Sequence, residues 1–346
     1  MFLFPKPKKF LGIDLGSTSI KLVELYKKGG FPVLSTYGYI ERPAEQNWRL
    51  SENVEEAIPQ LVAYLKKLYQ NSGASGYEVI TALPNFSVFN STIMVPVMKD
   101  KELKSAITWE AKKFVPLPIE DLILDWKIIE TVQIDREQKY KILLTVAAKD
   151  LAKRYMEVFR QADLQLTALE TEAFALARAL IGRDPSPVMV VDASAMSSDV
   201  IIVEKGIPIL NRSIDVGGVS ITRAIANSLG VDFNRADQFK RDIGMAGPSK
   251  IPKLIEVVLK PVIDEINYSL NLYQGQTQKK IEKVILSGGS AYLPNFDQYL
   301  SKIINLKVIV GDPWARIAYP AELKPALEEI APRFAVTIGL ALRQFE

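Results

Sequence analysis

The side chains in this sequence that could carry out chemistry are carboxylates, lysines and hydroxyls, gathered at short turns that contain glycine. The 346 residues include no histidine and no cysteine, which excludes disulfides, Cys/His zinc sites, thiol nucleophiles and imidazole bases. Catalysis or binding must therefore use carboxylates, ammonium groups, hydroxyls and backbone amides. The first turn of this kind reads Asp-Leu-Gly-Ser-Thr-Ser-Ile-Lys over residues 14–21.

That turn has the parts of a phosphate-binding site. Gly16 permits a tight turn, and Lys21 adds a positive charge. Between them stand three hydroxyl residues that can surround phosphate oxygens together with backbone N–H groups: Ser17, Thr18 and Ser19. We expect Asp14 to face a hydrated magnesium ion rather than the phosphate itself, because like charges repel. An ordinary exposed hairpin is the competing interpretation.

Two further turns could approach a nucleotide. After the apolar residues 284–286 comes a run without bulky side chains, Ser287, Gly288, Gly289 and Ser290. A flat base can approach such a backbone, and Tyr292 could cover the base. The run Asp-Val-Gly-Gly offers the amides of Gly217 and Gly218 at the start of a predicted helix. Ordinary strand-to-helix connections are the alternative for both.

Two copies of one pattern of elements position these turns. Apolar runs predict three strands in the first copy, over residues 9–15, 19–26 and 33–41. A helix with an apolar face follows over residues 51–69. The second copy has predicted strands over residues 188–193, 198–204 and 207–213, and then a helix over residues 220–229.

The repeat is also visible in the letters of the sequence. Similar stretches pair as follows: residues 12–15 with 190–193, and residues 21–25 with 200–204. In both copies an aspartate, Asp14 or Asp192, ends an apolar strand before a turn of small or hydroxyl residues. The duplication predicts two similar lobes with a ligand cleft between them. Asp14 and Asp192 are the candidate metal ligands.

Residues 84–163 belong to neither copy and predict their own strands and helices, which indicates an inserted subdomain. In residues 86–98 and 108–118, aromatic and Met side chains stand next to basic ones. That mixture suits a groove for an extended peptide. The alternative is that these side chains form the core of the insert.

Composition limits the partners and the location. The net charge of +3 is too balanced for nucleic acid to be the main partner. No window reaches the ~18 apolar residues that a membrane-spanning helix needs. The absence of cysteine suits the cytoplasm.

These pieces, in this order, resemble the actin, sugar-kinase and DnaK-type chaperone superfamily over nearly the whole chain. The resemblance implies an α/β fold of actin-like, duplicated ribonuclease-H-like lobes that bind ATP or ADP with Mg²⁺. It matches three groups of residues to the family's motifs: Asp14, Gly16, Ser17 and Lys21 to the first phosphate loop, Asp192 to the second, and residues 287–289 to the adenosine motif.

The resemblance also implies roles for several charged residues. Glu172 falls where the superfamily places a water-positioning residue, so Glu172 and Asp14 are the catalytic candidates. Asp237, Lys240 and Arg241 stand where chaperone-like members contact the ribose and base. A solvated charged helix face is the alternative for these three.

An insert between the two copies is the arrangement of the cell-division protein FtsA and of the PilM family of type IV pilus assembly proteins. Residues 12–25, 106–116 and 172–179 read most like the PilM family. FtsA-like chains continue into an amphipathic membrane helix, whereas this sequence ends directly after a predicted connecting helix that includes residues 336–341. We therefore expect a protein without an anchor of its own.

The family resemblance divides the chain into three parts. They are a first actin-like lobe (residues 1–83, 164–187 and 326–346), an FtsA-type insert (84–163), and a second lobe (188–325) with a helical subdomain at about 219–280.

The implied function is a cytoplasmic, ATP-binding scaffold of the type IV pilus platform, peripheral to the inner membrane through its partner. That partner is the N-terminal cytoplasmic peptide of a PilN-type bitopic membrane protein, alongside other pilus assembly proteins. The turn over residues 192–199 lacks the glycines of FtsA-like second loops, so we expect at most a slow ATPase. The alternatives are a small-molecule kinase of the sugar- or acetate-kinase type, and an FtsA-like filament former.

Overall fold

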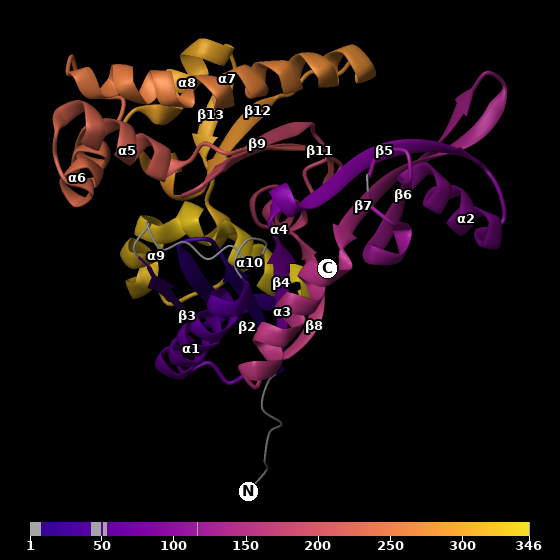
Figure 1. Cartoon of the computed structure of the whole chain (residues 1–346), viewed down its shortest axis with the longest axis horizontal. Coiled ribbons are helices and arrows are strands. Elements are labelled where there is room, and N and C mark those ends of the chain that lie inside the picture. Colours follow the sequence, from indigo (N-terminus) through magenta and orange to yellow (C-terminus); the bar gives the residue numbers. More distant parts are fainter. Residues whose placement is uncertain (1–7, 43–49, 51–53, 116, 346) are drawn as a thin grey trace, which may run out of the picture.

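Two sheets with the same strand order form the two lobes of the molecule (Figure 1). The computed structural model describes residues 8–42, 50, 54–115 and 117–345. The first sheet has the order β3 (Phe31–Glu41), β2 (Ser19–Lys28), β1 (Lys9–Leu15), β4 (Glu78–Leu83) and β8 (Gln165–Thr171). The second has the order β11 (Ile207–Ile214), β10 (Ser198–Glu204), β9 (Val188–Ala193), β12 (Lys283–Ser287) and β13 (Lys307–Val310).

The pairing within the sheets confirms the predicted duplication. In each sheet the first three strands are antiparallel and the next two are added in parallel. Asp14 pairs with Lys21 across the first hairpin, and Asp192 pairs with Asp199 across the second. The letter comparison, which aligned Lys21 with Val200, was therefore wrong by one residue. Both hairpins have the same length when counted through their pairing, and this makes Asp199 the counterpart of Lys21.

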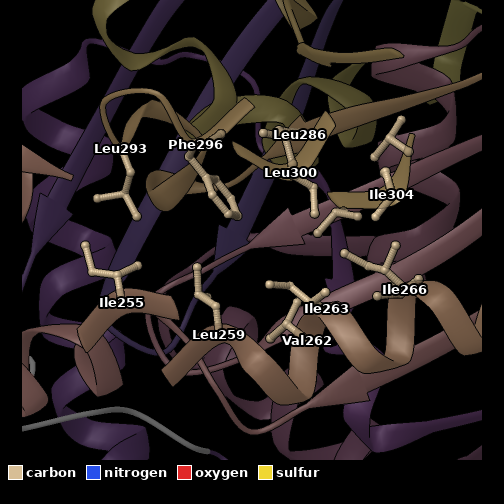
Figure 2. Packing of buried hydrophobic residues seen from close by; sticks show 14 of the residues in the cluster. Ile255, Leu259, Val262, Ile263, Ile266, Leu286, Leu293, Phe296, Leu300 and Ile304 are labelled. Atoms are coloured by element: carbon tan, nitrogen blue, oxygen red, sulfur yellow. The ribbon is translucent and has the colours of Figure 1, made fainter. Parts of the chain in front are cut away.

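The core of the second lobe lies between its sheet and a layer of helices. These are α5 (Gly218–Leu229), α6 (Phe233–Ile243), α7 (Lys250–Thr277) and α8 (Phe296–Ile304). Apolar residues recur in α7 at steps of three and four, and Ile255, Leu259 and Ile266 face Leu286 and Leu300 across the core (Figure 2). The predicted helical subdomain thus shares one core with the second sheet.

Two helices cross between the lobes, α4 (Glu172–Leu180) and α10 (Ala335–Leu342). A Cβ atom on Gly339 of α10 would lie 1.9 Å from the carbonyl oxygen of Ala175 in α4. On the other side of α10, a Cβ atom on Gly12 would lie 2.4 Å from the carbonyl oxygen of Thr337. Only glycine permits these backbone approaches, so residues 12 and 339 set the distance between the lobes.

The insert is a separate layer that projects to one side of the lobes (Figure 1). Its sheet has the order β5 (Val88–Pro96), β7 (Glu137–Ala148) and β6 (Leu122–Ile134), covered by α2 (Asp100–Ala111). In contrast, α3 (Lys149–Gln161) packs with α1 (Val54–Ser72) in the core of the first lobe. We therefore propose that the insert ends before α3 rather than at residue 163.

The remaining helix is α9 (Lys324–Ile330), which lies in the first lobe beside α10. The expected start of the first helix at residues 51–53 lies outside the described residues, as do residues 1–7, 43–49, 116 and 346. Within the described part of the chain, no helix is both long enough and apolar enough to cross a membrane.

A buried carboxylate organises the edge of the first sheet. Glu24 on β2 is fully buried and accepts hydrogen bonds of 2.7 Å from the backbone amides of both Ser75 and Gly76. The ammonium group of Lys9 lies 3.1 Å from its other oxygen. Burial raises the pKa of Glu24, but the hydrogen bonds from the two amides, Ser35 and Lys9 together hold that pKa below the ordinary value of 4.5.

We predict that Glu24→Gln lowers the free energy of unfolding at neutral pH by about 2–4 kcal/mol, because a charge-assisted acceptor is lost in a buried site. The stabilisation by the carboxylate is complete above its ordinary pKa of 4.5 and is lost as the pH falls through the lower folded value. The difference in unfolding free energy between the parent and the Glu24→Gln protein, measured by urea titration, should therefore shrink as the pH is lowered. Glu78→Gln, which alters a partly exposed ion pair with Lys8, should cost under about 1 kcal/mol.

Candidate functional site

One cavity of about 790 Å³ lies between the lobes, and both hairpins contribute to its wall. Its lining includes all but one of the residues predicted for the site: Asp14, Gly16, Ser17, Thr18, Ser19, Lys21, Glu172, Asp192, Gly218, Asp237, Lys240, Arg241, Gly288, Gly289, Ser290 and Tyr292. Gly217 is the exception. It precedes α5 and packs against Ser194 and Ala195.

The first hairpin brings a lysine and an aspartate into contact. The ammonium group of Lys21 donates a hydrogen bond of 2.8 Å to Asp14, and both side chains are almost completely buried. The turn that follows Asp14 is tight, because a Cβ atom on Gly16 would lie 2.9 Å from the carbonyl oxygen of Ser19. A positive charge and the hydroxyl turn therefore face the cavity together.

The second hairpin places two acids where the first has an acid and a base. Ser194 donates a hydrogen bond of 2.7 Å to Asp192, and the hydroxyl of Ser213 donates one to Asp199. Asp199 lines the cavity but was not predicted as a site residue. The available signal was its position seven residues after Asp192, which is the separation of Lys21 from Asp14.

Burial and mutual repulsion weaken the ionisation of these acids. Burial, opposed by the hydroxyl of Ser213 and reinforced by the charge of Asp192, raises the pKa of Asp199 to about 7. Burial also raises the pKa of Asp192. The pKa of Glu172 is raised well above its ordinary value, first by burial and then by the charges of Asp199 and Asp14. A bound cation would relieve this repulsion.

Glu172, the first residue of α4, is held by the segment that leads into the insert. The backbone amide of Asn85 donates a hydrogen bond of 2.9 Å to its carboxylate, and the amide of Ala173 donates one of 3.1 Å to the side-chain oxygen of Asn85. These two bonds join the start of α4 to residues 85–87, a short helical turn just before β5. The position of Glu172 therefore depends on the base of the insert.

The start of α5 does not offer the free amides that the sequence predicted. The amide of Gly218 donates a hydrogen bond of 2.9 Å to the carbonyl of Ser194, and the amide of Val219 donates one of 2.9 Å to that of Ala195. The second hairpin turn thus occupies these donors itself. Gly218 remains on the cavity wall, but its N–H group is already bonded.

The charged residues of α6 form a compact network. Lys240 donates hydrogen bonds to the carbonyl of Gly218, to the hydroxyl of Thr222 and to Asp237. Burial lowers the pKa of Lys240, although its bond to Asp237 opposes this shift. Arg241 also contacts Asp237, at 2.5 Å, and its side chain is 76% exposed. Lys240 therefore ties α6 to α5, whereas Arg241 reaches toward solvent at the cavity rim.

The glycines after β12 have different structural roles. Gly288 has a φ of +80°, and a Cβ atom there would lie 2.5 Å from the carbonyl oxygen of Ala193, so it permits close contact with the end of β9. A Cβ atom on Gly289 would meet only the side chain of Arg333, at 3.9 Å from its Cγ atom, so no backbone atom crowds a ligand at this position. Tyr292 is fixed by a hydrogen bond from its hydroxyl to the carbonyl of Glu328.

The acids of the cavity suit a hard cation without forming a complete cage. Within residues 8–42, 50, 54–115 and 117–345, no three His, Cys, Asp or Glu side chains are grouped closely enough to hold a metal ion. Carboxylates such as Asp14 and Asp192 are ligands that magnesium accepts, usually one or two at a time together with water and phosphate oxygens. The donor set therefore fits magnesium carried with a phosphate ligand.

Comparison with known proteins assigns the family. A family model described as type IV pilus assembly protein PilM matches residues 12–345. The chain belongs to the PilM family. A PilM-family member is thus a component of type IV pilus assembly, as the sequence motifs predicted.

The solved structures extend this assignment to the fold. The chain is similar to the PilM–PilN type IV pilus biogenesis complex, with 27% identity, coverage of 97% of this chain and 98% of that chain, and a TM-score of 0.85. It shares the fold of MreB5 of Spiroplasma citri bound to AMPPNP, with 13% identity, coverage of 97% and 95%, and a TM-score of 0.54. The predicted actin-like fold is confirmed.

A relative known from its sequence covers part of the chain. FtsA of Borreliella burgdorferi is 24% identical over 184 residues, which are 46% of this chain and 43% of that protein. The chain thus matches less than half the length of this relative.

We predict that Asp199→Asn stabilises the protein at alkaline pH. The folded chain keeps a proton on Asp199 up to about pH 7, whereas an unfolded chain loses it near 3.8, so stability falls as the pH rises between these values. Without added nucleotide or magnesium, the substitution should raise the free energy of unfolding at high pH by about 1–3 kcal/mol and flatten its pH dependence.

Urea titrations across the pH range measure this effect. The exposed Asp264, paired with Lys260, supplies the control, because Asp264→Asn should change stability by less than about 0.5 kcal/mol. An Asp199→Asn protein that is less stable than the parent at high pH would contradict the electrostatic account of the cavity.

Proposed function

We propose that this chain is a nucleotide-binding scaffold of type IV pilus assembly that docks the N-terminal cytoplasmic peptide of a PilN-type inner-membrane protein. The observation that carries the proposal is the similarity to the PilM–PilN complex over 97% of the chain, with a TM-score of 0.85. The chain would then be held at the cytoplasmic face of the inner membrane through this partner, next to other assembly proteins.

The cavity supports binding of ATP or ADP. The turn of the first hairpin offers hydroxyls, amides and the charge of Lys21 to phosphate oxygens. The open backbone at Gly289 and the ring of Tyr292 lie on the other side of the same cavity, where a base would fit. Asp14 and Asp192 would hold Mg²⁺, and the bound ion would neutralise part of the negative charge of the phosphates. A protein of the same fold, MreB5, binds AMPPNP.

The arrangement supports a scaffold better than a fast enzyme. Glu172 and Asp14 are the only catalytic candidates that the sequence suggested, and Glu172 is held by backbone hydrogen bonds with its pKa raised by burial. The second turn carries Ser194 and Ala195 where a glycine-rich loop would allow close approach to a terminal phosphate. We therefore propose slow hydrolysis at most.

Neither alternative function is favoured. A small-molecule kinase needs a polar pocket for its acceptor near the terminal phosphate. Here the lining of the cavity includes the apolar side chains of Leu50, Phe86 and Leu151 and the ring of Tyr155. The comparisons match the whole chain to the PilM family and only part of it to FtsA, so an FtsA-like filament former is also disfavoured.

A patch of exposed apolar side chains at the base of the insert supports peptide docking. We define the base patch as Trp109, Phe114 and Leu117, which are 62%, 44% and 50% exposed. Phe114 stacks on Phe89 of β5, and the ammonium group of Lys113 lies 3.9 Å from the ring centre of Trp109. Such a patch with adjacent lysines suits an extended peptide that carries apolar and acidic side chains.

We predict that Lys21→Ala weakens the binding of magnesium ATP at least tenfold, because a charge-assisted phosphate contact worth about 1.5–3 kcal/mol is removed. Isothermal calorimetry measures the change. Lys66→Ala removes a half-buried lysine of the same lobe that pairs with Asp163, and should leave the affinity unchanged. Equal affinities of the parent and Lys21→Ala proteins would place the nucleotide elsewhere.

We predict that Phe114→Glu reduces binding of the synthetic N-terminal peptide of the cognate PilN-type protein by about tenfold or more, since a charge replaces an apolar anchor. Fluorescence anisotropy of the labelled peptide gives the affinity. Val257→Glu is the control, because it places the same charge at an exposed apolar position of the second lobe, where Val257 is 73% exposed. Binding of ATP should be unchanged in both variants, and a peptide that competes with ATP would show that the groove lies elsewhere.

A further inference from the structure

One edge of the first sheet carries aromatic and lysine side chains from four neighbouring strands. At this edge β2 turns into β3, where Lys28 pairs with Phe31, and β1 begins, where Lys9 pairs with Tyr26. Because β4 runs parallel to β1, its start lies at the same edge, directly after Tyr77. We call the set Lys8, Lys27, Lys28, Phe31 and Tyr77 the hairpin edge.

The two aromatic rings of the hairpin edge face solvent. Phe31 is 73% exposed and Tyr77 is 59% exposed. Their strands, β3 and β4, are separated by β2 and β1, so the two strands lie about 14 Å apart at the usual spacing. The lysines stand between them. Aromatic and basic side chains in one row are typical of surfaces that meet the headgroup layer of a membrane.

The lysines at the tip have uncompensated charges. Lys27 and Lys28 are exposed and form no ion pair with any residue that the structure describes. Lys8 is partly balanced by Glu78 at 3.1 Å, and Lys9 is paired with the buried Glu24. The tip therefore attracts anions, and two adjacent ammonium groups gain most from a surface with many negative charges.

The turn at the tip of the hairpin edge is open, and this suits a flat membrane surface better than a peptide partner. Gly29 and Gly30 form the turn with φ values of +58° and +90°, and a Cβ atom on either would meet nothing within 4 Å. The turn therefore faces open space at both glycines, so a flat surface such as a bilayer can approach it. A projecting Phe flanked by lysines is suited to enter the headgroup layer.

We propose that the hairpin edge binds the surface of an anionic lipid bilayer. Phe31 and Tyr77 enter the headgroup layer, and Lys27 and Lys28 contact lipid phosphates. This contact goes beyond the proposed scaffold function, since it uses neither the nucleotide cavity nor the base patch. It would give the chain a second, weak attachment to the membrane beside its peptide partner, and two weak attachments reinforce each other.

Co-sedimentation of the full chain with lipid vesicles tests the proposal. We expect binding to vesicles of phosphatidylglycerol and phosphatidylcholine, weaker binding at high salt, and little binding to phosphatidylcholine alone. Combining Lys27→Ser with Lys28→Ser should reduce the partition coefficient by about tenfold, and Phe31→Ser should also reduce it. The affinity for magnesium ATP should be unchanged in these variants, which separates this test from the nucleotide proposal.

Matched controls lie on the second lobe. Val257 is as exposed as Phe31, at 73%. Lys253 and Lys280 are exposed as well, so replacing both removes the same charge as replacing Lys27 and Lys28. Val257→Ser and the Lys253→Ser, Lys280→Ser pair should bind vesicles like the parent. In addition, Phe31→Trp should gain blue-shifted fluorescence over the parent when anionic vesicles are added.

Three outcomes would overturn the proposal. If the parent protein stays in the supernatant with anionic vesicles, the lipid contact is excluded. Equal losses in the hairpin-edge and second-lobe variants would show a general charge effect. Loss of binding on replacing Phe2 and Phe4 by serine, with full binding by the hairpin-edge variants, would assign the contact to the N-terminal sequence instead.

Discussion

The close crossing of α4 and α10 is the contact on which the rest of the molecule depends. Gly339 lies against the backbone of Ala175, and Gly12 lies against Thr337, so α10 packs against α4 and against β1 through close backbone contacts. The first residue of α4 is Glu172, and Gly12 is two residues from Asp14. Any larger residue at these crossings would separate the hairpins that form the cavity, because backbone atoms cannot yield as a flexible side chain can.

The duplicated lobes place unlike charges at equivalent positions. Lys21 in the first lobe corresponds to Asp199 in the second, so Asp14, Asp192 and Asp199 from the two hairpins and Glu172 from α4 line the same cavity as the ammonium group of Lys21. The first hairpin is internally balanced, since Lys21 bonds to Asp14. The second is not, and its acids have raised pKa values. Because of this imbalance, a bound cation would be stabilised most by the acids of the second lobe.

The insert is joined to the cavity by a short segment. Asn85 bonds to both Glu172 and Ala173, and β5 begins three residues later. The adjacent Phe86 lines the cavity, and Phe89 contacts Phe114 of the base patch. The proposed nucleotide and peptide sites are thus neighbours along one stretch of chain. Coupling between them, where it exists, must act equally in both directions, because binding free energies are linked.

Local patterns in the sequence were sufficient for the elements and for the duplication. The runs around Ile13 and Val190 predicted strands at the observed positions, and the spacing of Leu61, Leu65 and Leu68 predicted the helix α1. All the residues named for the site except Gly217 also line one cavity, since each stands in a turn or helix whose type could be identified from its own neighbours. Periodicity and turn chemistry act over a few residues, so one sequence is enough to identify them.

Only the tertiary structure decided which partners these groups have. Asp199 was missed because it stands within an otherwise apolar strand, and its pairing with Asp192 depends on hairpin register. The sequence suggested a free amide at Gly218, but in the structure the carbonyl of Ser194 accepts its hydrogen bond. Likewise, the apolar face of α3 predicted burial but not that α1, far away in the sequence, would cover it. Such contacts join distant segments, and they depend on the packing of the whole chain rather than on any local pattern.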